Sequence, residues 1–262
     1  MPDLDLTIPE HAYMFGFFQT DGHLYLQSGN KGKFTLELSK RDEHILYEFQ
    51  KLIPCYSSVI PRTRDTNFKK NSESCTLTVS DLDYRTLLNS LGIPYGKKPD
   101  LQKPPTISYS EIDFIRGIID ANGSVGMSKK NYPFISFTTY SDDMANYFKA
   151  FIAKHTGLIK NDERNKRDNI YNLTVFRDEA VILTRILYPL NCLSLKRKYA
   201  SAQEVIKWIR PEGMRTKSQH RSWTNEQDEF IKTHTIEESV QLLNRNKNSI
   251  EMRLWRLKRC SK

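Results

Sequence analysis

The strongest constraint on the fold of this chain is an internal repeat. Two short segments share one pattern, an apolar run with Gly at its third position that ends in a polar residue and Gly: MFGFFQTDG (Met14 to Gly22) and IRGIIDANG (Ile115 to Gly123). The twenty residues from Phe34 align without a gap with those from Phe134, and Thr76 to Ile93 resembles Asn172 to Pro189. A repeat of this size predicts two similar halves of about a hundred residues each.

Helical and strand periodicities alternate within each copy. Phe15 and Phe18 have helical spacing, as do residues 43–52 and 144–153, whereas Leu24/Leu26, Phe34/Leu36/Leu38 and Leu77/Val79 alternate as strands do. Turn residues around Gly29–Gly32 and Lys129–Tyr132 predict hairpins. We therefore expect the order αββαββα twice, an α+β fold with antiparallel sheets, and halves at residues 1–104 and 105–209.

A glycine stands in the middle of each apolar helix, at Gly16 and at Gly117. Glycine inside a helix costs about 1 kcal/mol relative to alanine, and close approach of another backbone is the usual reason for it. We therefore expect the two helices to pack together and to bring their last residues, Asp21 and Asn122, side by side. The glycine that follows each helix is predicted to form a left-handed cap: Gly22 and Gly123.

A carboxylate at a helix C-terminus lies in the negative end of the helix dipole, so Asp21 needs a nearby cation. Mg²⁺ prefers carboxylate, carbonyl and water ligands. A divalent cation beside a phosphodiester can activate water and stabilise the leaving oxygen. The pattern indicates phosphodiester hydrolysis at the end of the paired helices.

These motifs resemble the LAGLIDADG homing endonuclease family in its single-chain, two-motif form, over about residues 9–205. The resemblance implies two pseudo-symmetric halves whose saddle-shaped sheets lie in the DNA major groove, and a monomer that cleaves long, specific double-stranded sites. It implies Mg²⁺ or Mn²⁺ as cofactor, with Ca²⁺ as a non-productive substitute. The residues it assigns to the metal are Asp21, Asn122, Gly22 and Gly123, the first two of them catalytic.

Asn122 departs from the family pattern, which expects Asp or Glu at this place. An amide oxygen can ligate a metal but brings no negative charge. Three explanations remain open: an impaired or strand-biased nuclease, a catalytically inactive relative, or an engineered replacement that holds uncut substrate. An inactive relative would act as an intron RNA-splicing maturase or as a DNA-binding regulator.

Each copy closes on basic residues, a feature that the family places near the scissile phosphates. The resemblance assigns this catalytic role to Lys97 in the first copy and Lys196 in the second. Their neighbours Lys98 and Lys198 are the alternatives.

The predicted strands leave a polar face that is suited to reading base edges, while Lys and Arg at the turns bind phosphates. In the first copy this face carries His23, Tyr25, Gln27, Lys33, Thr35 and Glu37, with Arg62, Arg64, Lys69 and Lys70 from the later hairpin. In the second copy the corresponding residues are Ser124, Ser128, Lys129, Ser136, Thr138, Arg164, Lys166 and Arg167.

The last fifty residues form a separate pattern. Residues 210–222 are rich in basic residues and predict a linker, and residues 223–262 predict three short amphipathic helices with Thr224 and Thr235 as N-caps and a third start at Asn248 or Ser249. This small all-α segment resembles the Myb/SANT-like helix-turn-helix group. The resemblance implies DNA contacts from the third helix: Asn246, Lys247, Asn248, Ser249, Arg253 and Arg256.

Composition sets the remaining bounds. The formal net charge of +9 favours an anionic partner. The four cysteines show no paired spacing, which argues against a zinc site or a disulfide framework. Neither a secretion signal nor an apolar run long enough to span a membrane occurs, so we expect a soluble intracellular protein with no membrane partner.

Overall fold

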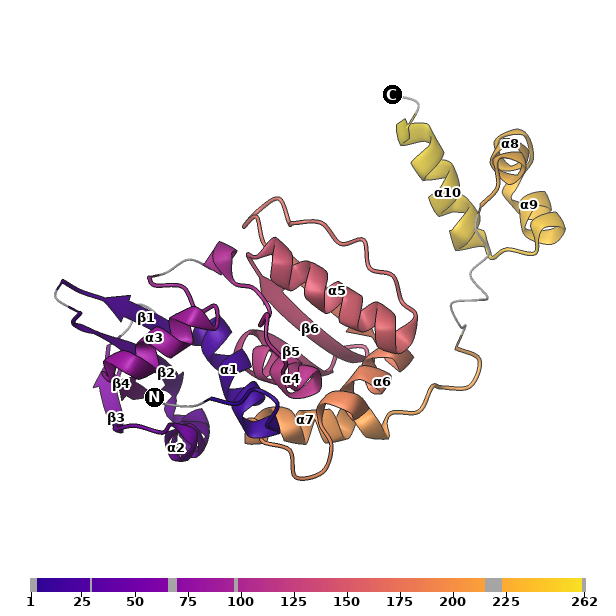
Figure 1. Ribbon diagram of the computed structural model, residues 1–262. Coiled ribbons are helices and arrows are strands. Elements are labelled where there is room, and N and C mark those ends of the chain that lie inside the picture. The colour runs from indigo at the N-terminus through magenta and orange to yellow at the C-terminus, as the bar shows by residue number, and fades with distance from the viewer. Residues whose placement is uncertain (1–3, 29, 66–69, 97–98, 215–222, 261–262) are drawn as a thin grey trace. The chain divides into compact units, whose positions relative to one another are not determined.

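The computed structural model describes residues 4–28, 30–65, 70–96, 99–214 and 223–260 (Figure 1). The chain forms two compact units, Met1–Arg210 and Pro211–Lys262. No helix in the described part of the chain has the length and apolar character needed to cross a membrane.

The first copy has the predicted element order. It contains α1 (Pro9–Asp21), β1 (His23–Leu26), β2 (Gly32–Ser39), the 3-10 turn η1 (Lys40–Asp42), α2 (Glu43–Leu52), β3 (Ser57–Arg64), β4 (Ser72–Val79), α3 (Leu82–Ser90) and the 3-10 turn η2 (Pro99–Leu101). The strands form one antiparallel sheet in the order β1-β2-β4-β3. Phe34, Leu36 and Leu77 are buried on its inner face, as the alternation predicted.

The second copy departs from the predicted order by one strand. It contains α4 (Glu111–Asn122), β5 (Gly123–Met127), β6 (Pro133–Thr139), α5 (Asp142–Thr156), β7 (Tyr171–Phe176), α6 (Arg177–Leu187) and α7 (Lys196–Lys207). Its antiparallel sheet has three strands, β5-β6-β7. The prediction of αββαββα is therefore wrong for this half, because residues 157–170 form no strand.

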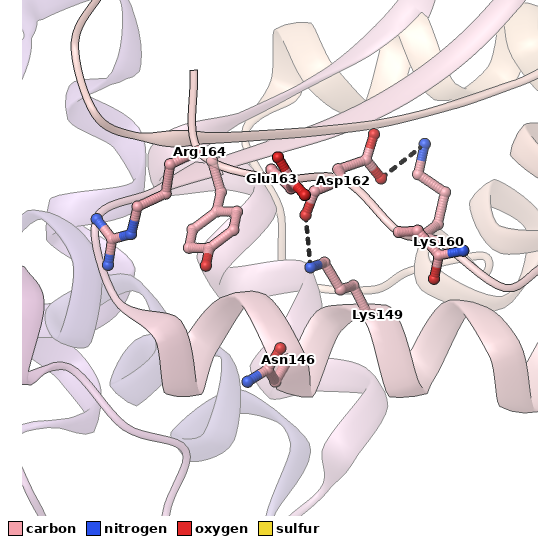
Figure 2. Close-up of a pocket in the computed structure, with 8 residues that line it drawn as sticks. Asn146, Lys149, Lys160, Asp162, Glu163 and Arg164 are labelled. Atoms are coloured by element: carbon pink, nitrogen blue, oxygen red, sulfur yellow. Dashed lines mark hydrogen bonds and ion pairs between the residues drawn. The ribbon is translucent and has the colours of Figure 1, made fainter. Parts of the chain in front are cut away.

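Side chains explain the lost strand. Lys149 on α5 donates to the backbone oxygen of Asp162 at 2.7 Å, and Lys160 donates to the backbone oxygen of Thr174 in β7 at 3.0 Å. Figure 2 shows both lysines reaching toward the segment around Asp162. Along this edge of the sheet, ammonium groups bind these two backbone oxygens in place of a neighbouring strand.

Helices α1 and α4 pack side by side between the two sheets (Figure 1). A β-carbon added at Gly16 would lie 2.3 Å from the backbone oxygen of Phe114, and one added at Gly117 would lie 2.2 Å from that of Tyr13. Each glycine therefore admits the backbone of the other helix, as predicted.

The predicted left-handed caps are wrong. Gly22 has φ −72° and Gly123 has φ −128°, so both residues are extended and lead directly into the following strand. Glycine is required there for space: a β-carbon at Gly22 would lie 2.4 Å from the oxygen of Phe18, and one at Gly123 would lie 2.4 Å from that of Ser136.

The second unit contains α8 (Asn225–Thr233), α9 (Ile236–Leu243) and α10 (Lys247–Cys260). Thr224 and Thr235 cap the first two helices with their side chains, as predicted. The third helix starts earlier than predicted, because the Asn246 side chain accepts from the backbone nitrogen of Ser249 at 2.8 Å and acts as the cap.

Candidate metal and DNA site

Asp21, the last residue of α1, carries an uncommitted carboxylate. Among the described residues no group hydrogen-bonds to this carboxylate, and no cation lies within ion-pair distance. Although Asp21 is exposed at the pocket mouth, nearby protein removes part of the water around its carboxylate and raises the pKa of Asp21 above its ordinary value of 3.8, and the charge of Lys198 partly opposes this rise. The ionised form is disfavoured to a limited extent, and a bound cation would favour it.

A pocket of about 360 Å³ opens beside Asp21. Its polar lining comes from the end of α1, the first two strands of the first sheet and the segment that connects the two copies: Gln19, Thr20, Asp21, His23, Glu37 and Gln102. Glu37 is already paired, because Arg64 lies 3.0 Å from it and the Ser74 hydroxyl donates to it at 2.7 Å. Asp21 is thus the free anion of this pocket among the residues described.

At the end of α1 a divalent cation would have Asp21 as its one charged protein ligand, with water and, when present, substrate phosphate completing the coordination. No three His, Cys, Asp or Glu side chains gather into a cage in the parts of the chain that are described. Mg²⁺ characteristically keeps several waters and takes one or two carboxylates together with substrate phosphates. A single free carboxylate in an open pocket suits that mode of binding.

Asn122 ends α4 in a different environment. Its amide nitrogen donates to the backbone oxygen of Thr138 at 2.8 Å, which fixes the side chain against β6. Asp120, two residues earlier, does not replace it. That carboxylate is buried and accepts hydrogen bonds at 2.7 Å from the hydroxyls of Tyr13 and Tyr188 and from the backbone nitrogen of Leu195.

Among the basic candidates, Lys198 reaches the helix ends. Its ammonium group is buried and donates to the backbone oxygens of Ile119, Asp120 and Gly123 at 2.7, 2.6 and 2.8 Å. Burial lowers the pKa of Lys198 to about 8, and Asp120 acts in the opposite direction. The Lys196 side chain is exposed to solvent. Lys97 and Lys98 lie outside the described residues, although their neighbours Gly96 and Pro99 line the Asp21 pocket.

Gln102 belongs to this site, and no sequence pattern pointed to it. Its side-chain nitrogen donates to the backbone oxygens of Gln19 and Thr20 near the end of α1, at 2.6 and 3.3 Å. A glutamine in an irregular segment has no periodicity or spacing that marks it, so only the tertiary structure finds it.

The first sheet presents the predicted polar face. His23 pairs with Thr35 and Tyr25 with Lys33, on the side opposite buried Phe34 and Leu36. Gln27 continues past β1 and is exposed. Arg62 and Arg64 lie 3.9 and 3.0 Å from Glu37. Lys70 is exposed, and Lys69 lies outside the described residues.

The second sheet brings together only part of its predicted set. Ser124 pairs with Ser136, and Thr138 follows on the same face, where its hydroxyl donates to Asn172 at 3.2 Å. Ser128 and Lys129 lie in the hairpin turn. Arg164 binds the backbone oxygens of Tyr140 and Asn169. Of the predicted cations of this half, Lys129, Lys166 and Arg167 are exposed, and Arg167 pairs with Asp168 at 2.7 Å.

In the second unit, Arg253 is held inside the helical bundle. Its guanidinium donates to both carboxylate oxygens of Asp228, at 2.7 and 2.6 Å, and lies over the ring of Trp223. The other predicted contact residues are exposed or half-buried on α10 or its cap: Asn246, Lys247, Asn248, Ser249 and Arg256.

Two close-packed helices between antiparallel sheets, with a free carboxylate at one helix end, define a LAGLIDADG-like architecture. Residues 110–185 match the family model of the LAGLIDADG-like domain. No curated protein matches the chain.

Solved structures show the same fold at low sequence identity. A structure of the I-SmaMI LAGLIDADG homing endonuclease bound to cleaved DNA is 11% identical with a TM-score of 0.50, covering 76% of this chain and 88% of that one. I-SmaMI bound to uncleaved DNA in the presence of calcium ions is 12% identical with a TM-score of 0.50, covering 76% and 90%. Variants of the homing endonuclease I-DmoI are 14% identical with a TM-score of 0.51, covering 74% and 97%. The chain therefore has the LAGLIDADG homing endonuclease fold.

Proposed function

We propose that this protein is a site-specific endonuclease for double-stranded DNA that works with a divalent cation at Asp21. The observation that carries this proposal is the uncommitted carboxylate at the end of α1, at the junction of two helices that glycines hold together. The fold, which it shares with I-SmaMI bound to DNA, gives the polar sheet faces a natural ligand.

The residues divide the work of hydrolysis. Asp21 would hold the cation, Mg²⁺ or Mn²⁺, which activates water and stabilises the leaving oxygen. Water adds across one P–O bond: its oxygen binds phosphorus, and the bridging oxygen leaves with a proton. His23, Thr35 and Ser136 would contact bases, and exposed Lys33, Lys166 and Arg167 would bind phosphates. Both motifs lie in one chain, so a monomer suffices.

Cleavage can be tested once the protein has been used to select its own DNA target. Duplexes retained by the protein from a random-sequence pool are cloned into a supercoiled plasmid and incubated with Mg²⁺. We expect nicked or linear plasmid with the native chain and none with Asp21→Asn. The Asn122→Asp form should react faster, because a second negative charge at the paired helix ends would strengthen the binding of the cation at Asp21. If neither the native chain nor Asn122→Asp breaks a strand, the nuclease proposal is wrong.

Asn122 also favours a second candidate, a protein that binds nucleic acid and no longer cuts it. Such a protein would act as an intron-splicing maturase or as a DNA-binding regulator. A splicing assay with intron-containing transcript distinguishes these roles: acceleration of splicing by both the native chain and Asp21→Asn supports the maturase.

The second unit would act as a helix-turn-helix module of the Myb/SANT-like kind. Exposed Lys247, Asn248 and Arg256 on α10 suit major-groove and phosphate contacts. Arg253, bound to Asp228, would instead stabilise the module. Tethering this module to the first unit raises its effective concentration at the same DNA site.

A further inference from the structure

At the ends of both α1 and α4, a side chain donates hydrogen bonds to the free backbone oxygens. The donor is neutral at α1 and positively charged at α4. Each end exposes backbone oxygens in the negative end of a helix dipole. At α1 the donor is the neutral amide of Gln102, which binds the oxygens of Gln19 and Thr20. At α4 the donor is the ammonium group of Lys198, which binds three backbone oxygens within 2.8 Å.

The last residues of the two helices differ in charge as well, and in the opposite direction to the caps. The helix with the neutral cap ends in the carboxylate of Asp21, and the helix with the cationic cap ends in the amide of Asn122. The α1 end therefore carries a free negative charge. The α4 end carries the positive charge of Lys198, which the buried carboxylate of Asp120 balances most strongly and that of Asp21 to a smaller extent.

A divalent cation does not fit the α4 end. The backbone oxygens there already accept from Lys198, and both oxygens of Asp120 are occupied by Tyr13, Tyr188 and Leu195. The amide nitrogen of Asn122 donates to Thr138, which leaves only its neutral amide oxygen as a ligand. A cation placed there would meet an ammonium group and no free anion. The α1 end offers a free carboxylate beside an open pocket.

We propose that the protein binds one divalent cation, at Asp21, and that the Lys198 ammonium group occupies the place of a second cation at the end of α4. One consequence rests on the proposed endonuclease function: the protein cuts one strand of its target and leaves the other intact. The first half thus provides a negative charge at its helix end, Asp21, and the second half provides a positive charge at the corresponding place, Lys198.

Cation stoichiometry tests this proposal without any DNA. Mn²⁺ is titrated into the full chain, and the electron paramagnetic resonance signal of free Mn²⁺ reports the bound fraction. We expect one equivalent for the native chain and loss of that binding in Asp21→Asn. The double variant Asn122→Asp/Lys198→Gln copies the α1 end onto α4 and should bind a second equivalent. Two equivalents of similar affinity in the native chain, or unchanged binding in Asp21→Asn, would overturn the proposal.

A reciprocal variant covers the case in which replacement of buried Lys198 prevents folding. Gln102→Lys changes a half-buried residue and brings an ammonium group to the α1 end. We expect at least a tenfold loss of Mn²⁺ affinity from this change, with the circular dichroism spectrum unchanged. Retained affinity in a folded Gln102→Lys protein contradicts the proposal.

Strand mapping then tests the consequence. On a plasmid that carries the selected target, the native chain should give nicked circles with the break always on one strand, and the folded double variant should give linear product. Native cleavage of both strands at equal rates contradicts the single-cation site. If one Mn²⁺ binds at Asp21 but no DNA strand is ever broken, the proposed function fails and the cation assignment stands.

Discussion

Asp21 lies where a carboxylate opposes the helix dipole, and no described residue forms an ion pair with it. A separate cause, partial loss of surrounding water, raises the pKa of Asp21 and also disfavours the charged form. A group of this kind lowers stability while it is ionised. The Asp21 carboxylate therefore does not contribute to the stability of the fold, which is consistent with a role in binding a cation.

Replacement of this charge should stabilise the protein. In the presence of a chelator at neutral pH, we expect Asp21→Asn to raise the free energy of unfolding by about 0.3–1 kcal/mol, the range for a charge at a helix terminus. Because the folded pKa is raised, the penalty is fully present above that pKa and disappears as the pH falls below the ordinary value of 3.8. Urea titrations across this pH range measure the difference. A destabilised Asp21→Asn protein at neutral pH contradicts this account.

At the scale of elements, the α1–α4 contact depends on two residues that lack a β-carbon. Gly16→Ala and Gly117→Ala should each lower the free energy of unfolding by about 1–3 kcal/mol, as overpacking does, because the new atom meets backbone that cannot move aside. Thermal melting measures the loss. Gly126→Ala is the matched control, since a β-carbon there meets only the Phe134 ring at 3.8 Å. Equal melting temperatures for all three variants would exclude close helix packing as the role of these glycines.

The second unit has its own pH dependence. Hydrogen bonds from Arg253 hold the pKa of Asp228 below its ordinary value of 3.8. A depressed carboxylate contributes stability that is present above 3.8 and is lost as the pH falls through the folded pKa. We therefore expect the Trp223 fluorescence transition of this unit to move to lower denaturant concentration on acidification. Asp228→Asn should be less stable at neutral pH and should lose most of this acid dependence.

Local sequence patterns predicted most elements of the first unit, because apolar periodicity reflects burial on one face. The close approach at the two glycines of the helix pair was predicted on another ground, the cost of glycine inside a helix. Patterns failed where distant side chains bind backbone: Lys149 and Lys160 replace a strand, and Gln102 caps a helix more than eighty residues earlier. The requirement for glycine at position 22 also comes from tertiary structure, because an added β-carbon would lie 2.6 Å from the Phe34 ring, and no helix-cap rule contains this contact.

For the whole molecule, the two halves of the first unit are joined at more than the helix pair. Arg197, beside Lys198 on α7, donates to both carboxylate oxygens of Asp42 in the first copy at 3.0 Å. The backbone nitrogen of Lys196 lies 3.3 Å from His44. The start of α7 is thus fixed to both halves, which positions Lys198 at the end of α4.

The second unit should contribute charge to DNA binding beyond that of the first. Each phosphate contact changes the slope of log K against log salt by about 0.9 for duplex DNA. We expect Lys247→Gln/Arg256→Gln, which removes two exposed cations of α10, to flatten the slope by up to about 1.8 and to weaken binding at low salt. Fluorescence anisotropy with a selected duplex between about 50 and 200 mM salt measures both quantities. Lys232→Gln is the control, because Lys232 lies on α8 and pairs with Glu229 at 2.7 Å. A slope that the α10 variant leaves unchanged would exclude this helix from the phosphate contacts, and the sheets of the first unit would then account for binding alone.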